Sequence, residues 1–299
     1  MVLANYLGNI NTVPAWLKHA QDIGYTVVDL VAPLFIFAIG LTYSLSFNRR
    51  KTRDGDWTTY NHIVSRYLSL IGIGLLITLV GVSASYYTGS TNWGLFQAIG
   101  TAGLIALMFI QIDVRYRWIF GVILLGVYQF LLDRFWLQQV LDSAHNGPYG
   151  ALSWGAMLIL STCYGEMYQQ KDKQRWFPVF SLLATILGIL LSFSVPLSKN
   201  RASASYVLLS VGLSGLMFNL FHALNMDNPF TKILSAWGKN PLLLYLLHGV
   251  FLGIFLMMPG TFWYIDAPYW LIIIQASVLL ILINWICFEF NKRGWFLNL

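Results

Sequence analysis

Long apolar segments separated by short polar connections run through the whole chain. The pattern predicts nine membrane-spanning helices, over residues 27–47, 63–82, 95–110, 118–132, 151–167, 176–195, 207–221, 242–258 and 270–290. Several of these segments are shorter than the roughly 20 apolar residues that a full bilayer crossing needs. Flanking Trp, Tyr and small polar residues are expected to complete them. The predicted fold class is therefore all-α, a polytopic integral membrane protein with about nine to ten transmembrane helices.

Composition supports a membrane protein. Of the 299 residues, 57% are hydrophobic and 10% are charged, whereas a soluble domain has about 25% charged residues. No connection is long enough for a separate soluble domain, so we expect residues 1–299 to form a single transmembrane domain. Residues 1–10 are too short to cross a bilayer and lack the charged start of a signal peptide. They form either an interfacial turn or the end of a first helix that a longer gene product would complete.

The net charge of +6 indicates membrane orientation rather than nucleic-acid binding. When the loops are assigned alternately to two faces, 14 of the 18 Lys and Arg residues fall on one face and 4 on the other. Because positive charge is enriched in cytoplasmic loops, we expect the richer face in the cytoplasm and His19 on the extracytoplasmic side. The richer face holds Arg49, Arg50, Lys51, Arg53, Arg66, Arg115, Arg117, Lys171, Lys173, Arg175, Lys232, Lys239, Lys292 and Arg293, and the other holds Lys18, Arg134, Lys199 and Arg201.

Sequence motifs for metal or nucleotide binding are not evident. Cys163 and Cys287 both lie in apolar segments, so a disulfide framework is not expected, and their spacing is not that of a metal site. The chain contains no P-loop, dinucleotide-binding fingerprint or zinc-protease motif. We therefore expect no metal cofactor.

Polar and ionisable residues in or beside apolar helices are functional candidates, because a bilayer makes them costly. His19 lies in a short polar connection directly before the helix at 27–47. Its imidazole can exchange a proton near neutral pH, which suits a general base; the alternative is an interfacial histidine solvated by headgroups and water. Asp29 can orient His19 or, with Thr26, form a capping box at the helix start. These two roles are compatible.

Other polar residues fall at helix ends or in loops. Asn240 precedes a helix that begins near Pro241, and His248 lies roughly 12 Å further along that helix. His248 needs a partner or a water-filled cavity; a structural hydrogen bond to another helix is the alternative. Lys199 and Arg201, in the outer loop, either meet an anionic group or are solvated. Glu166 and Glu289 lie beside Lys and Arg at cytoplasmic helix ends, where salt bridges are expected.

Four motifs in family order together resemble one group of membrane enzymes. LKHAQDIGYTVVDLVAPLFIFAIGLTYSLS, the end of MVLANY, PLSKNRASASYVL and GKNPLLLYLLHGVF are similar to segments of the transmembrane acyltransferases typified by heparan-alpha-glucosaminide N-acetyltransferase. The segments span most of the chain. One departure is the stretch at residues 96–100, where the family often has an arginine and this chain has FQAIG.

The resemblance implies an enzyme that moves an acetyl group from cytosolic acetyl-CoA to a sugar amine or hydroxyl beyond the membrane. The family's catalytic histidine maps onto His19, and its helix-one asparagine onto Asn5. Its late-helix asparagine and histidine map onto Asn240 and His248, which would line or support the donor tunnel. Lys199, Asn200 and Arg66 match family positions and are expected to bind substrate or donor. Asn5 would donate to the developing oxyanion or fix the tautomer of His19.

Two other functions remain open from the sequence. A transporter or flippase for a small molecule or lipid-linked glycan would also have many helices and a histidine near the midplane, although paired broken helices and matching halves are not evident. A non-catalytic membrane partner that keeps the fold is the third interpretation. A homo-oligomer is compatible with all three.

Overall fold

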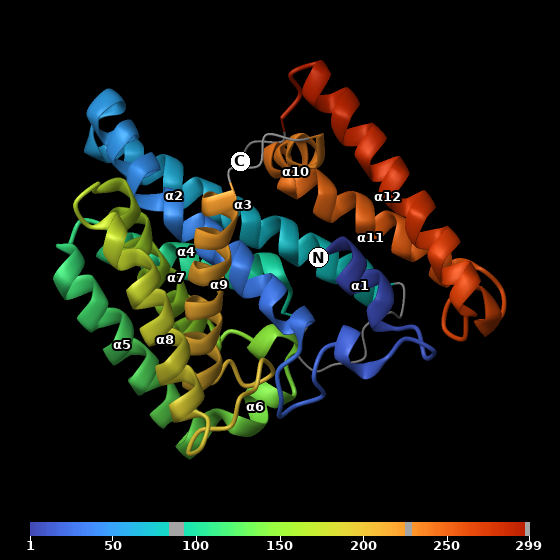
Figure 1. Cartoon of the computed structure of the whole chain (residues 1–299), viewed down its shortest axis with the longest axis horizontal. Coiled ribbons are helices and arrows are strands. Elements are labelled where there is room, and N and C mark those ends of the chain that lie inside the picture. Colours follow the sequence, from blue (N-terminus) through green and yellow to red (C-terminus); the bar gives the residue numbers. More distant parts are fainter. Residues whose placement is uncertain (84–92, 225–228, 297–299) are drawn as a thin grey trace. The chain divides into compact units, whose positions relative to one another are not determined.

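The computed structural model describes residues 1–83, 93–224 and 229–296, and within these ranges every regular element is a helix (Figure 1). The predicted all-α class is confirmed for this part of the chain. Its α-helices are α1 (Val2–Gly8), α2 (Val31–Asp54), α3 (Asp56–Ser83), α4 (Leu95–Phe109), α5 (Val114–Leu131), α6 (Leu137–Leu141), α7 (Ala151–Gln169), α8 (Phe177–Leu191), α9 (Ala204–Leu224), α10 (Pro229–Lys239), α11 (Pro241–Met257) and α12 (Tyr269–Lys292). A short 3-10 helix, η2 (Val27–Leu30), leads directly into α2.

Each of the nine apolar segments coincides with a helix, but the count of nine to ten spans is not confirmed. Six helices in the described part of the chain are long and apolar enough to cross a bilayer, and a seventh span results if α10 and α11 are taken together. The α4 helix has only 15 residues, and α7, which is rich in Ser, Thr and Gly, is not among the six. The α10 and α11 helices meet at a 94° bend.

The described residues form two compact units that are interleaved in sequence. The first comprises residues 1–19, 26–31 and 221–299, and the second comprises residues 20–25 and 32–220. The chain therefore passes between units within the connection that precedes α2. The expectation of a single transmembrane domain stays a prediction.

The second unit is built around α7. Fourteen of the 19 residues of α7 are buried, and the helix packs against α4, α5 and α8. Figure 1 shows α5, α7 and α8 running side by side. Glycines allow α2 to approach α7 closely: a Cβ at Gly40 would lie 2.3 Å from the Cβ of Ser161, and one at Gly165 would lie 2.5 Å from the carbonyl oxygen of Leu41. Small residues on facing helices permit such close packing in membrane proteins.

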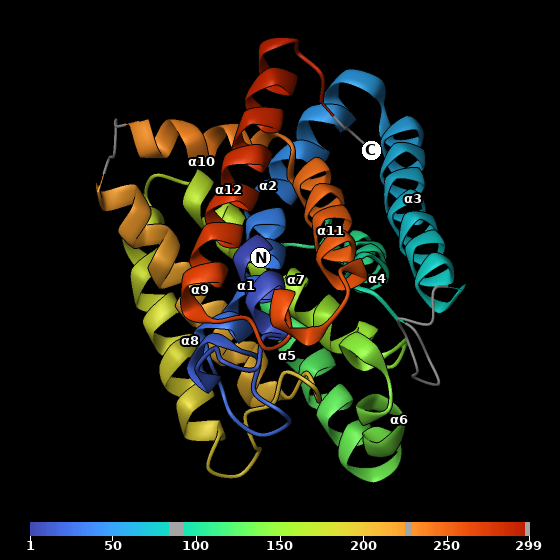
Figure 2. The same ribbon diagram turned by 90° about the vertical axis from the view of Figure 1, so that its right-hand side faces the viewer.

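The first unit is held together by a cluster in which α1 joins the C-terminal helices. Figure 2 shows α1 beside α11 and α12, and buried side chains of all three helices form one core. The hydroxyl of Tyr6 donates to Gln275 Oε1 at 2.7 Å, and the hydroxyl of Tyr264 donates to the carbonyl oxygen of Tyr6 at 2.7 Å. These hydrogen bonds satisfy the polar ends of the tyrosines inside an otherwise apolar core.

The approach of α2 to α7 predicts the effect of adding one methyl group. Gly40→Ala should destabilise the protein by about 1–3 kcal/mol, because overpacking forces the two helices apart. Gly126→Ala in α5 is the matched control, since a Cβ there meets no atom within 4 Å and alanine favours a helix by about 1 kcal/mol. Thermal unfolding in detergent measures both. Equal melting temperatures for the two variants would contradict the close contact.

Candidate functional site

His19 and Asp29 form a hydrogen-bonded pair in the first unit. His19 Nδ1 lies 2.8 Å from Asp29 Oδ1. The other carboxylate oxygen, Oδ2, accepts the backbone N–H of Thr26 at 3.0 Å, and the Thr26 hydroxyl donates to the carbonyl oxygen of Lys18 at 2.7 Å. Thr26 and Asp29 form the predicted capping box at the start of η2. Asp29 therefore orients His19 and caps the helix at once.

The two members of this pair differ in exposure, and the difference defines their chemistry. The Asp29 side chain is fully buried, whereas the His19 side chain is 38% exposed. A buried carboxylate that accepts a hydrogen bond from Nδ1–H favours the imidazole tautomer in which Nε2 carries the lone pair. The pair thus has the arrangement of a general base with its orienting group.

Asn5 and His248 meet in the first unit, although 243 positions separate them in sequence. Asn5 Nδ2 lies 2.8 Å from His248 Nε2, which gives His248 the partner that its depth in α11 requires. The sequence predicted a role for Asn5 beside His19, whereas the structure joins Asn5 to the late-helix histidine. This bond also ties α1 to α11.

Asn240 lies elsewhere, at the N-cap of α11. Its side chain is fully buried and donates to Asn291 Oδ1 at 3.1 Å and to the carbonyl oxygen of Trp295 at 3.1 Å. Asn240 therefore ties the bend between α10 and α11 to the end of α12. It holds the helix that carries His248.

The loop between α8 and α9 is ordered by the segment that follows His19 in sequence. Arg201 Nη2 donates to Asp22 Oδ2 at 2.5 Å, and Ser198 Oγ donates to Asp22 Oδ1 at 2.9 Å. The Arg201 guanidinium holds the pKa of the Asp22 carboxyl below its usual value. The Asn200 side chain donates to the carbonyl oxygen of Gln21. Arg201 therefore binds a carboxylate of the protein itself.

Lys199 and Arg66, the other predicted binding residues, occupy separate places in the second unit. The backbone carbonyl of Lys199 accepts the side-chain amide of Asn146 at 2.9 Å. Arg66 is an exposed residue of α3 whose guanidinium lies 5.9 Å from the Tyr67 ring centroid. Their roles in binding substrate or donor stay predictions.

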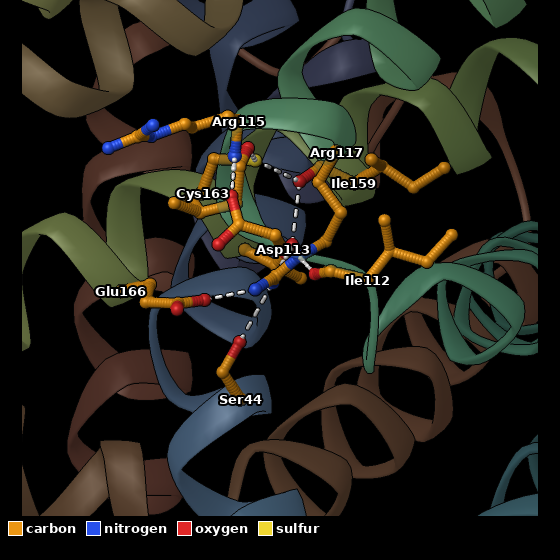
Figure 3. Close-up of polar contacts among 10 residues, drawn as sticks. Ser44, Ile112, Asp113, Arg115, Arg117, Ile159, Cys163 and Glu166 are labelled. Atoms are coloured by element: carbon orange, nitrogen blue, oxygen red, sulfur yellow. Dashed lines mark hydrogen bonds and ion pairs between the residues drawn. The ribbon is translucent and has the colours of Figure 1, made fainter.

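Arg117, in the second unit, is a buried arginine for which the sequence predicted only a position in a cytoplasmic loop. Arg117 is 3% exposed; its Nη1 donates to the hydroxyls of Ser44 and Thr162 at 3.2 Å each, and its Nη2 pairs with Glu166. Figure 3 shows the guanidinium between Ser44 and Glu166. Arg117 thereby connects α2, α5 and α7. The signal available in the sequence was Glu166, an acidic residue at the end of a helix.

The expected salt bridges of both glutamates are confirmed. Glu166 pairs with Arg117, and Glu289 lies 3.6 Å from Arg293 one turn along. Cys163 and Cys287 are buried free thiols. In residues 1–83, 93–224 and 229–296, no three His, Cys, Asp or Glu side chains are grouped as metal ligands.

The basic end of α2 carries a groove of about 350 Å³. Its lining residues come from the last turns of the helix. Two carry hydroxyl groups, three carry guanidinium groups and one is apolar: Thr42, Ser46, Arg49, Arg50, Arg53 and Leu45. Arg50 and Arg53 also contact Asp54.

Several long apolar helices among the described residues define an integral, multi-pass membrane protein. Residues 1–250 match the family described as heparan-alpha-glucosaminide N-acetyltransferase, catalytic, and the chain belongs to this family of membrane acyltransferases. It is also similar to a Dictyostelium discoideum protein named phosphatidylinositol-glycan biosynthesis class W protein. The two are 24% identical over 218 residues, which are 64% of this chain and 44% of the relative. The matched region thus covers less than half of that relative.

The Arg117 contacts predict a large loss of stability when the guanidinium is removed. Arg117→Met should destabilise the protein by about 3–5 kcal/mol, because the Glu166 carboxylate then loses its partner. Arg115→Met is the control, since Arg115 is exposed two positions earlier on the same helix. Thermal unfolding of both variants in detergent measures the difference. A normal melting temperature for the Arg117 variant would show that the buried pair is dispensable.

Proposed function

We propose that this protein transfers an acyl group, such as acetyl, from cytosolic acyl-CoA to a sugar amine or hydroxyl on the outer side of the membrane, with His19 as the group that acts on the acceptor. The observation that carries the proposal is the 2.8 Å contact between His19 Nδ1 and the buried Asp29 carboxylate. Membership in the acyltransferase family supports the reaction class. The excess of Lys and Arg on one face supports the orientation.

In the simplest mechanism, His19 is a general base. Nε2 takes the proton of the acceptor hydroxyl or amine as the acceptor attacks the thioester carbonyl. The tetrahedral intermediate then collapses, the carbon–sulfur bond breaks, and the CoA thiolate leaves and takes the proton from the His19 imidazolium. Asp29 stabilises the imidazolium that forms in between.

In the alternative mechanism, His19 is a transient acyl carrier. Nε2 then attacks the thioester carbonyl first, the carbon–sulfur bond breaks, and CoA leaves as the thiolate. In the second step the acceptor attacks the acyl carbon, the carbon–nitrogen bond to His19 breaks, and the proton of the acceptor goes to the thiolate. Labelled acyl donor supplied without acceptor distinguishes the two routes, because only the second leaves label on His19.

Asn5 acts through His248 in this proposal. The 2.8 Å contact between Asn5 Nδ2 and His248 Nε2 holds α1 against α11 and fixes the orientation of the His248 imidazole. Asn240 fixes the start of the same helix through Asn291 and Trp295. We therefore assign Asn5, Asn240 and His248 to positioning the walls of the donor path.

The groove at the end of α2 is the proposed binding site for the donor phosphates. Arg49, Arg50 and Arg53 lie within one turn of each other and line it together with Thr42 and Ser46. Guanidinium groups bind phosphate through paired hydrogen bonds, and serine and threonine hydroxyls add further donors. Cytosolic acyl-CoA would meet this groove if the richer positive face is cytoplasmic.

A glycan acceptor is favoured by the names of the related proteins. One refers to a glucosaminide and the other to a phosphatidylinositol glycan. Each name refers to a sugar, and sugars carry amines or hydroxyls that can be acylated. The proposed acceptor class is therefore an amino sugar or a lipid-linked glycan.

Replacement of His19 tests the base. His19→Ala should lower the rate of labelled acyl transfer by about 100-fold or more, since a positioned base contributes about 10²–10⁴-fold. Asp29→Asn should also lower the rate while leaving the side chain nearly the same size. Transfer is measured in proteoliposomes with a panel of amino-sugar acceptors, and the melting temperature of each variant checks its fold. Normal transfer by folded His19→Ala would refute the proposal.

A donor-free assay separates this enzyme from a carrier. Acceptor movement across liposomes without acyl-CoA would favour the transporter interpretation. Failure of the purified protein to bind acyl-CoA would favour a non-catalytic partner. Each result contradicts acyl transfer independently of the His19 variant.

The donor groove predicts a selective effect on KM. The triple variant Arg49→Gln/Arg50→Gln/Arg53→Gln should raise KM for acyl-CoA by at least about tenfold, because each lost charge weakens phosphate binding. The same variant should change KM far less for an acyl-pantetheine donor that lacks the nucleotide. Lys51→Gln is the control: Lys51 lies at the same helix end but pairs with Asp56 at 3.1 Å. Equal effects on both donors would place the phosphates elsewhere.

A further inference from the structure

A second groove lies in the first unit, at the end of α12. It measures about 620 Å³ and is lined by Thr231, Ser235, Ala236 and Lys239 of α10 and by Phe288, Asn291 and Lys292 of α12. Figure 2 shows α10 lying across this end of α12. None of these residues belongs to the His19 site or to the basic end of α2.

One wall of the groove is the polar face of an amphipathic helix. Thr231, Ser235 and Lys239 recur every four residues along α10 and therefore share one face. On the other side, Trp237 donates from Nε1 to Asn284 Oδ1 of α12 at 3.1 Å. The 94° bend before α11 turns α10 away from the direction of a membrane-crossing helix, as expected for a helix that lies in the interfacial plane.

The other wall combines positive charge with a long apolar stripe. Ile281, Trp285, Phe288 and Lys292 follow a 4-3-4 spacing on α12 and so lie on one face of the helix. The three apolar members are 66%, 63% and 60% exposed. The stripe therefore runs along a candidate membrane span and ends at the groove with a lysine.

The groove concentrates positive charge. Among the described residues, no acidic side chain forms an ion pair with Lys239 or Lys292, and nearby Glu289 pairs with Arg293 instead. The position of α10 is fixed by Asn291, whose Nδ2 donates to the carbonyl oxygen of Ala236 at 2.9 Å. Two ammonium groups and two hydroxyl-bearing residues therefore line a preformed space.

We propose that this groove binds the phosphate of an anionic phospholipid, with an acyl chain lying along the apolar stripe of α12. Lys239 and Lys292 contact the phosphodiester, and Thr231 and Ser235 line the same groove. Basic residues at the membrane surface attract anionic lipid headgroups. The continuous apolar stripe favours a lipid over a soluble phosphate, because a soluble ion gains nothing from Ile281, Trp285 and Phe288.

Binding of short-chain lipids to the purified full chain in detergent tests the site. The probes are dioctanoyl phosphatidylglycerol, dioctanoyl phosphatidylcholine and inorganic phosphate, with dissociation constants from native mass spectrometry and thermal shift. Wild type should bind phosphatidylglycerol in preference to phosphatidylcholine. Lys239→Gln/Lys292→Gln should weaken phosphatidylglycerol binding by at least about tenfold, whereas Lys239→Arg/Lys292→Arg should retain it.

Two further variants complete the test. Lys171→Gln/Lys173→Gln removes the same charge from the connection between α7 and α8 and should leave binding unchanged. Trp285→Ala interrupts the stripe and should weaken phosphatidylglycerol binding without affecting phosphate. Equal binding of both lipids, equal losses in the two lysine pairs, or binding of phosphate as tight as that of the lipid would each overturn the proposal.

Discussion

A carboxylate buried at the start of a long apolar helix needs hydrogen-bond donors from the protein, because burial removes it from solvent. Asp29 meets this requirement with the His19 ring on one oxygen and the Thr26 backbone amide on the other. The same contacts fix where η2 begins and how the imidazole is turned. Local folding and the proposed chemistry therefore depend on one buried charge.

The same constraint explains the polar contacts deeper in each unit. In the second unit, Arg117 is surrounded by Ser44, Thr162 and Glu166, so three helices share one buried cation. In the first unit, the hydrogen bond between Asn5 Nδ2 and His248 Nε2 joins α1 to α11. Each of these polar contacts makes the pairing of its helices more specific, because apolar helix surfaces alone can pack against many partners.

Periodicity and composition predicted much of the fold. Every apolar segment forms a helix, and the Thr26–Asp29 capping box is present as expected. The predicted count of nine to ten spans is not confirmed: among the described residues, six helices are long and apolar enough to cross a bilayer, or seven if the bent pair α10 and α11 counts as one span.

The sequence by itself determined the helical class, the membrane environment, the family and the proximity of His19 to Asp29, since these depend on composition or on residues close in the chain. Only the tertiary structure decided that Asn5 meets His248, that Arg201 binds Asp22, and that Arg117 is buried rather than a loop charge. These contacts join residues 45 to 243 positions apart. A buried polar side chain requires a hydrogen-bond partner, but its own sequence position does not identify that partner. The packing of the helices determines which residue supplies it.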